Sequence, residues 1–324
     1  MLPCRALFIL GVLMLALAHP AAAETYPARP VTLVAPYAAG GGADLIARLM
    51  AQKLGERLGR ASVVENRLGA GGMIAASSVA KAAPDGYTLF MGTSTQLAIQ
   101  VTLHKSLPYD PAADFVPIAL LASVPFVLIV HPSLPVHSVT DLIHLAKAKP
   151  GQLSFGSSGV GGPPHLFTEL LKTMTGIEMT HIPYKGTAQA MTDVVAGHVP
   201  LIFSDLAPAI PLLRDGRLRA LGISSAVRFT GLPDIPPIAE TVPGFDAVAW
   251  LALVAPAGTP GEIVDKLNEE VKAIMATPDV QQRFVDLGNI PLVSPSVAEL
   301  QRYVKSEIVR WGKVVEKAGL AGSE

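Results

Sequence analysis

The body of this sequence lacks cysteine. Cys4 is the only cysteine among the 324 residues and lies at the very start of the chain. A chain without thiols beyond that point forms no disulfide, uses no thiolate nucleophile and holds no metal through cysteine.

An excess of either charge is also missing. The chain has 25 Lys and Arg against 26 Asp and Glu, which gives a formal net charge of −1. We therefore expect no basic surface for a nucleic-acid backbone. Half of the residues are hydrophobic and 16% are charged, which excludes a disordered chain and a coiled coil. The length predicts two domains or one large α/β unit.

Long hydrophobic runs are scarce. Arg5 precedes the apolar stretch 7–18, and Ala21-Ala22-Ala23 follow it. This order predicts a secretory signal peptide over residues 1–23, cleaved after Ala23, and hence a periplasmic protein. A retained N-terminal anchor is the alternative, but the run is shorter than the roughly 20 residues that a membrane helix needs. The longest later uncharged stretch, 115–130, contains Pro117 and Pro125 and predicts two buried strands.

Local catalytic signatures are absent as well. The sequence has no G-x-S-x-G or H-E-x-x-H motif, and no glycine cluster is followed by Lys-Ser or Lys-Thr. Gly69-Ala70-Gly71 misses the dinucleotide fingerprint because Ile74 stands where a small residue is needed. We expect no enzyme, no metal and no cofactor, although a triad scattered along the chain leaves no local signature.

What the sequence does contain is a repeated order of strand, glycine-rich turn and helix. This order predicts mostly parallel sheets flanked by helices, in two rigid α/β lobes around a cleft. The expected strands are 30–36, 62–66, 87–91, 126–130, 153–156, 179–182, 199–203, 220–224 and 247–254. The expected helices are 44–58, 73–82, 139–149, 164–175, 188–196, 260–276 and 297–318.

Three of the strand-to-helix turns are rich in Gly, Ser and Thr: residues 37–44, 92–96 and 157–165. A helix N-terminus offers unpaired N–H groups and partial positive charge, and glycine lets an anion approach the backbone. Each glycine also fits a simple tight turn, but three such loops together favour an anion-binding cleft at the carboxyl ends of the strands.

Single residues in these segments have two interpretations each. His165 fits a donor to a ligand or a cap on its own loop, and Asp44 fits a ligand contact or a helix cap. Tyr184-Lys185 fits a cleft position or a solvated turn. Trp250 and Trp311 favour packing over a ligand platform.

The ordered motifs resemble the extracytoplasmic receptors of tripartite tricarboxylate transporters, the Bug family. The resemblance covers nearly the whole chain after residue 23. The motifs are Tyr26-Pro27 and Pro30, Val34, Pro36-Tyr37, Gly40-Gly41 and Asp44, Val64 to Arg67, Gly69 to Gly72, Ala83 to Leu89, Leu107 to Pro111, Asp114-Phe115, Ala146 to Gly151, Gly159 and Gly161 with His165-Leu166, Pro183 to Gly186, Leu253, Ala255-Pro256, Gly258 to Pro260 and Arg310 to Gly312.

The resemblance implies a two-lobed periplasmic binding protein fold of type II-like α/β architecture. Its chain would cross between the lobes twice, with residues 24–126 and 248–324 in the first lobe and 127–247 in the second. It further implies a monomeric receptor that binds a di- or tricarboxylate, an acidic amino acid or an aromatic acid, and that delivers this ligand to membrane transporter subunits.

The ligand-binding residues that the resemblance implies come from loops of both lobes. They are Tyr37, Ala38, Ala39, Gly40, Gly41, Asp44, Thr93 and Ser94 in the first lobe, and Ser157, Ser158, Gly161, Gly162, His165, Tyr184, Lys185, Ser204 and Asp205 in the second.

This chain departs from the family pattern at two places. Gly162 is followed by Pro163-Pro164 where a Ser or Thr is common, and Phe203-Ser204-Asp205-Leu206 stands where Phe-Asp-Asn-Leu is usual. Both changes affect the side of the cleft that meets the far end of the ligand. Two alternatives stay open: a receptor that signals to a sensor protein, and an exported two-lobed enzyme, which would show a nucleophile and a base within hydrogen-bond reach in the cleft.

Overall fold

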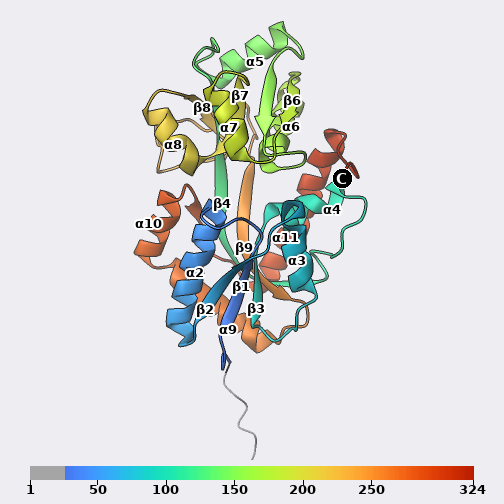
Figure 1. Ribbon diagram of the computed structural model, residues 1–324, viewed down its shortest axis with the longest axis vertical. Coiled ribbons are helices and arrows are strands. Elements are labelled where there is room, and N and C mark those ends of the chain that lie inside the picture. The colour runs from blue at the N-terminus through green and yellow to red at the C-terminus, as the bar shows by residue number, and fades with distance from the viewer. Residues whose placement is uncertain (1–25) are drawn as a thin grey trace, which may run out of the picture.

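The computed structural model describes residues 26–324, and the expected signal peptide lies outside them. Two groups of strands and helices lie one above the other, joined at the waist by β4 (Phe115–Val130) and β9 (Val248–Pro256) (Figure 1). Within the described part of the chain, no helix is both long and apolar enough to cross a membrane. The expected two-lobed α/β architecture is confirmed.

The other elements follow the expected order. The strands are β1 (Val31–Ala35), β2 (Ser62–Asn66), β3 (Thr88–Thr93), β5 (Ser154–Ser157), β6 (Thr180–Pro183), β7 (Leu201–Asp205), β8 (Arg219–Ile223) and β10 (Ile290–Pro291). The helices are α2 (Gly42–Leu58), α3 (Met73–Ala80), α4 (Gln100–Leu103), α5 (Val139–Ala148), α6 (Pro163–Thr175), α7 (Thr187–Val195), α8 (Leu206–Arg214), α9 (Gly261–Met275), α10 (Pro278–Asp286) and α11 (Val297–Lys317). Short turns of other helix types are η1 (Ala70–Gly72), η2 (Thr95–Ile99) and η3 (Ile238–Glu240).

The strands form a mixed sheet in the order β2-β1-β3-β9-β4-β7-β5-β6, with β8 and β10 also paired to β4. The strands β1, β2 and β3 are parallel, and so are β5, β6 and β7, as the strand–turn–helix order predicts. The strands β9 and β4 pair antiparallel to their neighbours, so each lobe is less uniformly parallel than expected. We name the β2-β1-β3-β9 side with its helices the first lobe and the β7-β5-β6-β8 side the second.

The prediction of two strands over 115–130 is wrong, because one strand of 16 residues spans this range. Its first part pairs with β9 in the first lobe and its last part with β7 and β8 in the second. Pro117 lies at a register shift, and Pro125 is the last residue that pairs with β9. Proline has no N–H to donate, and it is tolerated where a ladder is irregular or changes partner.

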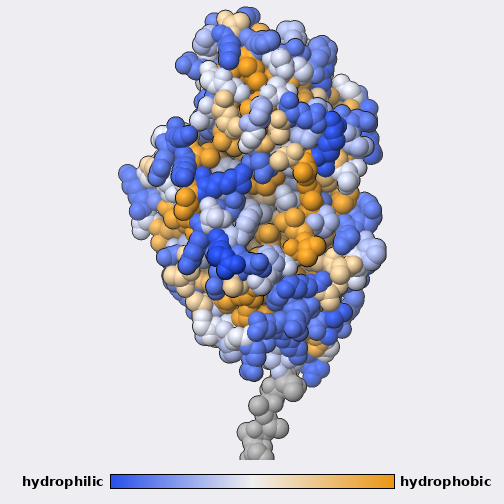
Figure 2. Space-filling model, turned by 180° about the vertical axis from the view of Figure 1, so that it is seen from behind, coloured by the Kyte–Doolittle hydropathy of each residue, from blue (hydrophilic) through white to orange (hydrophobic). Residues whose placement is uncertain are grey.

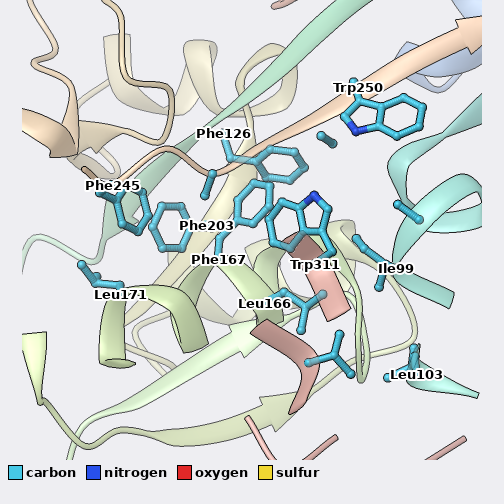
Figure 3. Packing of buried hydrophobic residues seen from close by; sticks show 14 of the residues in the cluster. Ile99, Leu103, Phe126, Leu166, Phe167, Leu171, Phe203, Phe245, Trp250 and Trp311 are labelled. Atoms are coloured by element: carbon cyan, nitrogen blue, oxygen red, sulfur yellow. The ribbon is translucent and has the colours of Figure 1, made fainter. Parts of the chain in front are cut away.

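A continuous aromatic core fills the waist between the lobes. Trp311 of α11 stacks on Phe167 of α6 with ring centroids 5.6 Å apart, and Trp250 of β9 lies close by (Figure 3). Both indole N–H groups donate to the buried carboxylate of Glu307, at 2.9 and 3.0 Å. The expectation that both tryptophans serve packing is therefore confirmed. Seen from behind, hydrophobic residues show between hydrophilic ones across the middle of the molecule (Figure 2).

Candidate functional site

The register of the sheet brings the expected loops of the two lobes to facing edges. Thr93 at the end of β3 pairs with Leu251, three residues after β9 enters the first lobe. Asp205 at the end of β7 pairs with Phe126, the first residue of β4 on the second-lobe side. Because parallel strands end at the same edge, β1 and β3 point towards the second lobe, and β5, β6 and β7 point towards the first.

The loop from Tyr37 to Asp44, which we name the first loop, is fixed by one buried carboxylate. Asp44 accepts hydrogen bonds from the Gly40 N–H, from Arg48 Nε and from Asn66 Nδ2, each at 2.8 Å. Asn66 also donates to the Tyr37 carbonyl at 2.8 Å. Burial disfavours the charged carboxyl, but the hydrogen bonds from these three residues outweigh it and hold the pKa of Asp44 below its usual value. Asp44 therefore shapes its own loop.

The first loop exposes backbone donors. Ala38, Ala39, Gly40 and Gly41 are exposed to solvent. The first-turn N–H groups of α2, at residues 42–44, have no partner within residues 26–324. Gly40 has a φ of +86°, which an L side chain rarely adopts. This arrangement is suited to bind an anion.

Gln96, which sequence reasoning did not single out, connects three loops of the first lobe. Its amide oxygen accepts from the Thr93 hydroxyl at 2.8 Å, and its nitrogen donates to the Gly71 carbonyl at 2.6 Å and to the Tyr37 hydroxyl at 3.1 Å. Tyr37 in turn lies 3.2 Å from the Thr93 hydroxyl. The neighbouring Ser94 hydroxyl is fully buried and has no partner within the described residues.

The loop from Ser157 to Gly162, which we name the second loop, is held by two histidines. The Gly161 N–H donates to His165 Nδ1 at 3.1 Å, so His165 caps its own loop. The Ser157 hydroxyl lies 2.6 Å from His181 Nε2, donates to the Gly159 carbonyl and accepts from the Gly159 N–H. His181 was absent from our prediction, because only the fold brings β6 beside β5.

The two imidazole rings stack on each other, with centroids 3.7 Å apart and planes 11° from parallel. Burial, His181 and Lys172 lower the pKa of His165 to about 3. Burial and Lys172 lower the pKa of His181 to about 4. Both rings are neutral at neutral pH, so neither of these two histidines offers a cation to an anion at the second loop.

The N-terminus of α6 has fewer donors than we expected. Pro163 and Pro164 occupy its first two positions and have no N–H. Within the described chain, the N–H groups of Ser158, Val160 and His165 have no hydrogen-bond partner. The unpartnered backbone N–H groups that this lobe offers to a ligand therefore come mainly from the second loop, and fewer come from the first turn of α6.

The remaining expected residues lie at the same edge with different surroundings. The Tyr184 hydroxyl donates to Asp193 at 2.6 Å, and Lys185 is exposed. Ser204 is buried and donates to the Asp205 carbonyl at 3.1 Å. Asp205 precedes α8, and burial raises the pKa of its carboxyl. Within residues 26–324 the carboxyl group of Asp205 forms no ion pair and receives no hydrogen bond from another residue.

The lobes touch beside the second loop. A Cβ added at Gly161 would collide with the side chain of Leu103, the last residue of α4. A hollow of about 490 Å³ lies elsewhere, between α8 and β8, and its walls include Ile210, Leu213 and Leu232. It lies apart from the facing loops, so we place the candidate site between them.

Comparison with known proteins shows the family of this chain. Residues 46–320 match the family described as the tripartite tricarboxylate transporter family receptor. The chain belongs to this family. One relative, BugT of Bordetella pertussis, is 37% identical to this chain over 319 residues. The aligned region covers 97% of this chain and 98% of BugT.

Solved structures of similar receptors share the fold. Rpa4515 of R. palustris with adipate is 43% identical with a TM-score of 0.82, and the match covers 91% of this chain and 99% of that one. MatC from Rhodopseudomonas palustris with bound malate is 36% identical with a TM-score of 0.77, and the match covers 90% of this chain and 100% of MatC.

Proposed function

We propose that this receptor captures a small organic carboxylate between its lobes in the periplasm and delivers it to a tripartite tricarboxylate-type membrane transporter. The observation that carries the proposal is the pair of facing loops with unpartnered N–H groups, the first loop with α2 and the second loop before α6. Such groups bind an anion without a metal or a cationic side chain. Adipate and malate, named with the two similar structures, belong to the ligand class that we propose.

We further propose lobe boundaries at residues 126 and 248, with residues 24–126 and 248–324 in the first lobe and 127–247 in the second. The change of partner along β4 between Pro125 and Phe126 supports the first crossing, and the start of β9 at Val248 supports the second. Closure would be favoured because only the closed form offers the ligand contacts from both loops.

One observation favours a second candidate function. Ser157 and His181 lie within hydrogen-bond reach, as the nucleophile and base of a hydrolase would. The Ser157 side chain is fully buried, however, and its hydroxyl is already bonded to Gly159. Within the described residues no carboxylate is bonded to His181, and a ring whose pKa is about 4 is a weak base at neutral pH. The pair fits a structural role better.

A thermal melt of residues 24–324 against a carboxylate panel tests the receptor function. The panel contains adipate, malate, succinate, citrate, aspartate, glutamate, benzoate and phthalate, and adipamide is the uncharged control. A ligand at 100 times its Kd adds about 2.7 kcal/mol, which raises Tm by several degrees in a chain of this size. We expect such a shift for one carboxylate class and none for adipamide. A flat result with protein refolded free of any co-purified ligand would contradict the proposal.

A further inference from the structure

The donors that the second lobe presents depend on the shape of the second loop. The N–H groups of Ser158 and Val160 belong to that loop, and Pro163-Pro164 remove the first two donors of α6. A shift of the loop by a fraction of an ångström would therefore misdirect most of the donors of this lobe, because hydrogen bonds weaken steeply with distance and angle.

Two imidazole rings fix this loop at both of its ends. His181 Nε2 contacts the Ser157 hydroxyl at 2.6 Å, where β5 ends, and His165 Nδ1 accepts from the Gly161 N–H at 3.1 Å, just before α6. The rings stack face to face, and the Phe155 ring of β5 continues the stack 5.0 Å from His181. The stack thus connects β5, β6 and α6 directly beneath the loop.

We propose that His165 and His181 are positioning residues, which set the backbone donors of the second loop for the ligand while both rings are neutral. This inference rests on the proposed function and names how one side of that site is built. Neither ring is assigned a contact with the ligand.

The contacts of the two imidazole rings favour the neutral form of both. His165 Nδ1 accepts from an N–H and so carries no proton, and two charged rings at 3.7 Å would repel each other. The charged groups that face the stack are Lys172 and Glu169. Lys172 is paired with Glu169 at 2.6 Å, and Glu169 Oε1 lies 3.8 Å from His165 Nε2. The lowered pKa values of both rings agree with this arrangement.

Two substitutions of His181 separate the effect of its hydrogen bond to Ser157 from the effect of ring stacking. His181→Phe keeps an aromatic ring but removes the contact to Ser157, whereas His181→Gln keeps a donor near the Nε2 position and removes the ring. His144→Gln, at an exposed position of α5, is the matched control. Amide hydrogen exchange at Gly159 and Gly161 reports the loop without ligand, and calorimetry with adipate, or with the panel member that shifts the melt, reports affinity.

We expect His181→Phe to speed exchange at Gly159 and to weaken binding about tenfold, which corresponds to the loss of roughly one hydrogen bond. His181→Gln should recover part of the affinity, and His144→Gln should match the wild type. Wild-type exchange and affinity in folded His181→Phe would overturn the inference. If no carboxylate binds the wild type, the receptor function fails, while the exchange rates still decide the role of the histidines.

If His181→Phe does not fold, the wild type itself provides the test. The ¹⁵N shifts of its imidazoles should show two neutral rings at pH 6, with Nδ1 of His165 unprotonated. A protonated ring at that pH would overturn the inference.

Discussion

At the residue scale, the polar side chains of the candidate site hold the backbone of its loops in place. Asp44 and Asn66 fix the first loop, Gln96 connects it to the turns at Gly71 and Thr93, and His165 caps the second loop. Backbone N–H groups are then left free at positions that these side chains determine. Changes at such residues should act on ligand affinity through the loop, as the histidine variants test.

The stacked histidines also predict how stability depends on pH. Their pKa values are lowered on folding, to about 3 for His165 and about 4 for His181, so the unfolded chain binds protons that the folded chain does not. Their contribution is present above the unfolded pKa of about 6.5, and it is lost as pH falls from there towards about 4 for His181 and about 3 for His165. One such ring accounts for about 2 kcal/mol or less of unfolding free energy between pH 7 and pH 5. The free energy of unfolding, measured in urea, should fall more steeply with decreasing pH for the wild type than for His181→Phe. Equal pH slopes for the two proteins would contradict this prediction.

Sequence reasoning found the loops but left the side-chain roles undecided. Asp44 and His165 each had two interpretations, since a sequence does not tell in which direction a side chain points. Gln96 and His181 were missed for another reason: their partners lie on elements that only the fold brings close. A polar residue shortly after a strand, within a turn rich in Gly, Ser and Thr, is the signal that would have found Gln96.

At the element scale, the strand–turn–helix order predicted most elements to within a few residues. Ser138 caps α5 through a hydrogen bond from the Asp141 N–H. The helix α8 was missed because Pro208 and Pro211 lie inside it, and proline predicts a loop. The turn η2 was missed because it follows β3 almost directly and its apolar residues resemble any buried run.

We predict that alanine has different effects on ligand affinity at two glycines of similar backbone conformation, Gly161 in the second loop and Gly151 before β5. Gly161 and Gly151 have φ values of +67° and +71°, so alanine strains the backbone similarly at both. A Cβ at Gly161 would meet Leu103 of the other lobe, whereas nothing lies within 4 Å of one at Gly151. We expect Gly161→Ala to weaken carboxylate binding by roughly tenfold or more, and Gly151→Ala to leave affinity unchanged.

Calorimetry on both variants and on Gly161→Ala with Leu103→Ala checks this. The double variant should recover affinity, since the smaller side chain leaves room for the added methyl group. Equal affinities for the two single variants would show that the contact with Leu103 has no bearing on binding.

At the scale of the whole molecule, the lobes share strands as well as contacts. The strand β4 pairs in both lobes, and α11 of the first lobe packs on α6 of the second through Trp311 and Phe167. Sequence analysis predicted the two lobes, but a single β4 through the waist was hidden by its prolines. Movement of the lobes would therefore bend β4 and shift the contact between Trp311 and Phe167.

The chain has only two tryptophans, and both donate to the same carboxylate, Glu307, at the waist. The tryptophan emission of the protein therefore originates entirely where the lobes meet, and none of it comes from the two loops. Carboxylate binding should change the intensity or wavelength of this emission, because Phe167 lies against Trp311. Stopped-flow fluorescence would then measure the rate of lobe closure without a label. If the emission does not change when the protein is saturated with ligand, Phe167 and Trp311 keep their contact as the lobes close, and α6 moves together with α11.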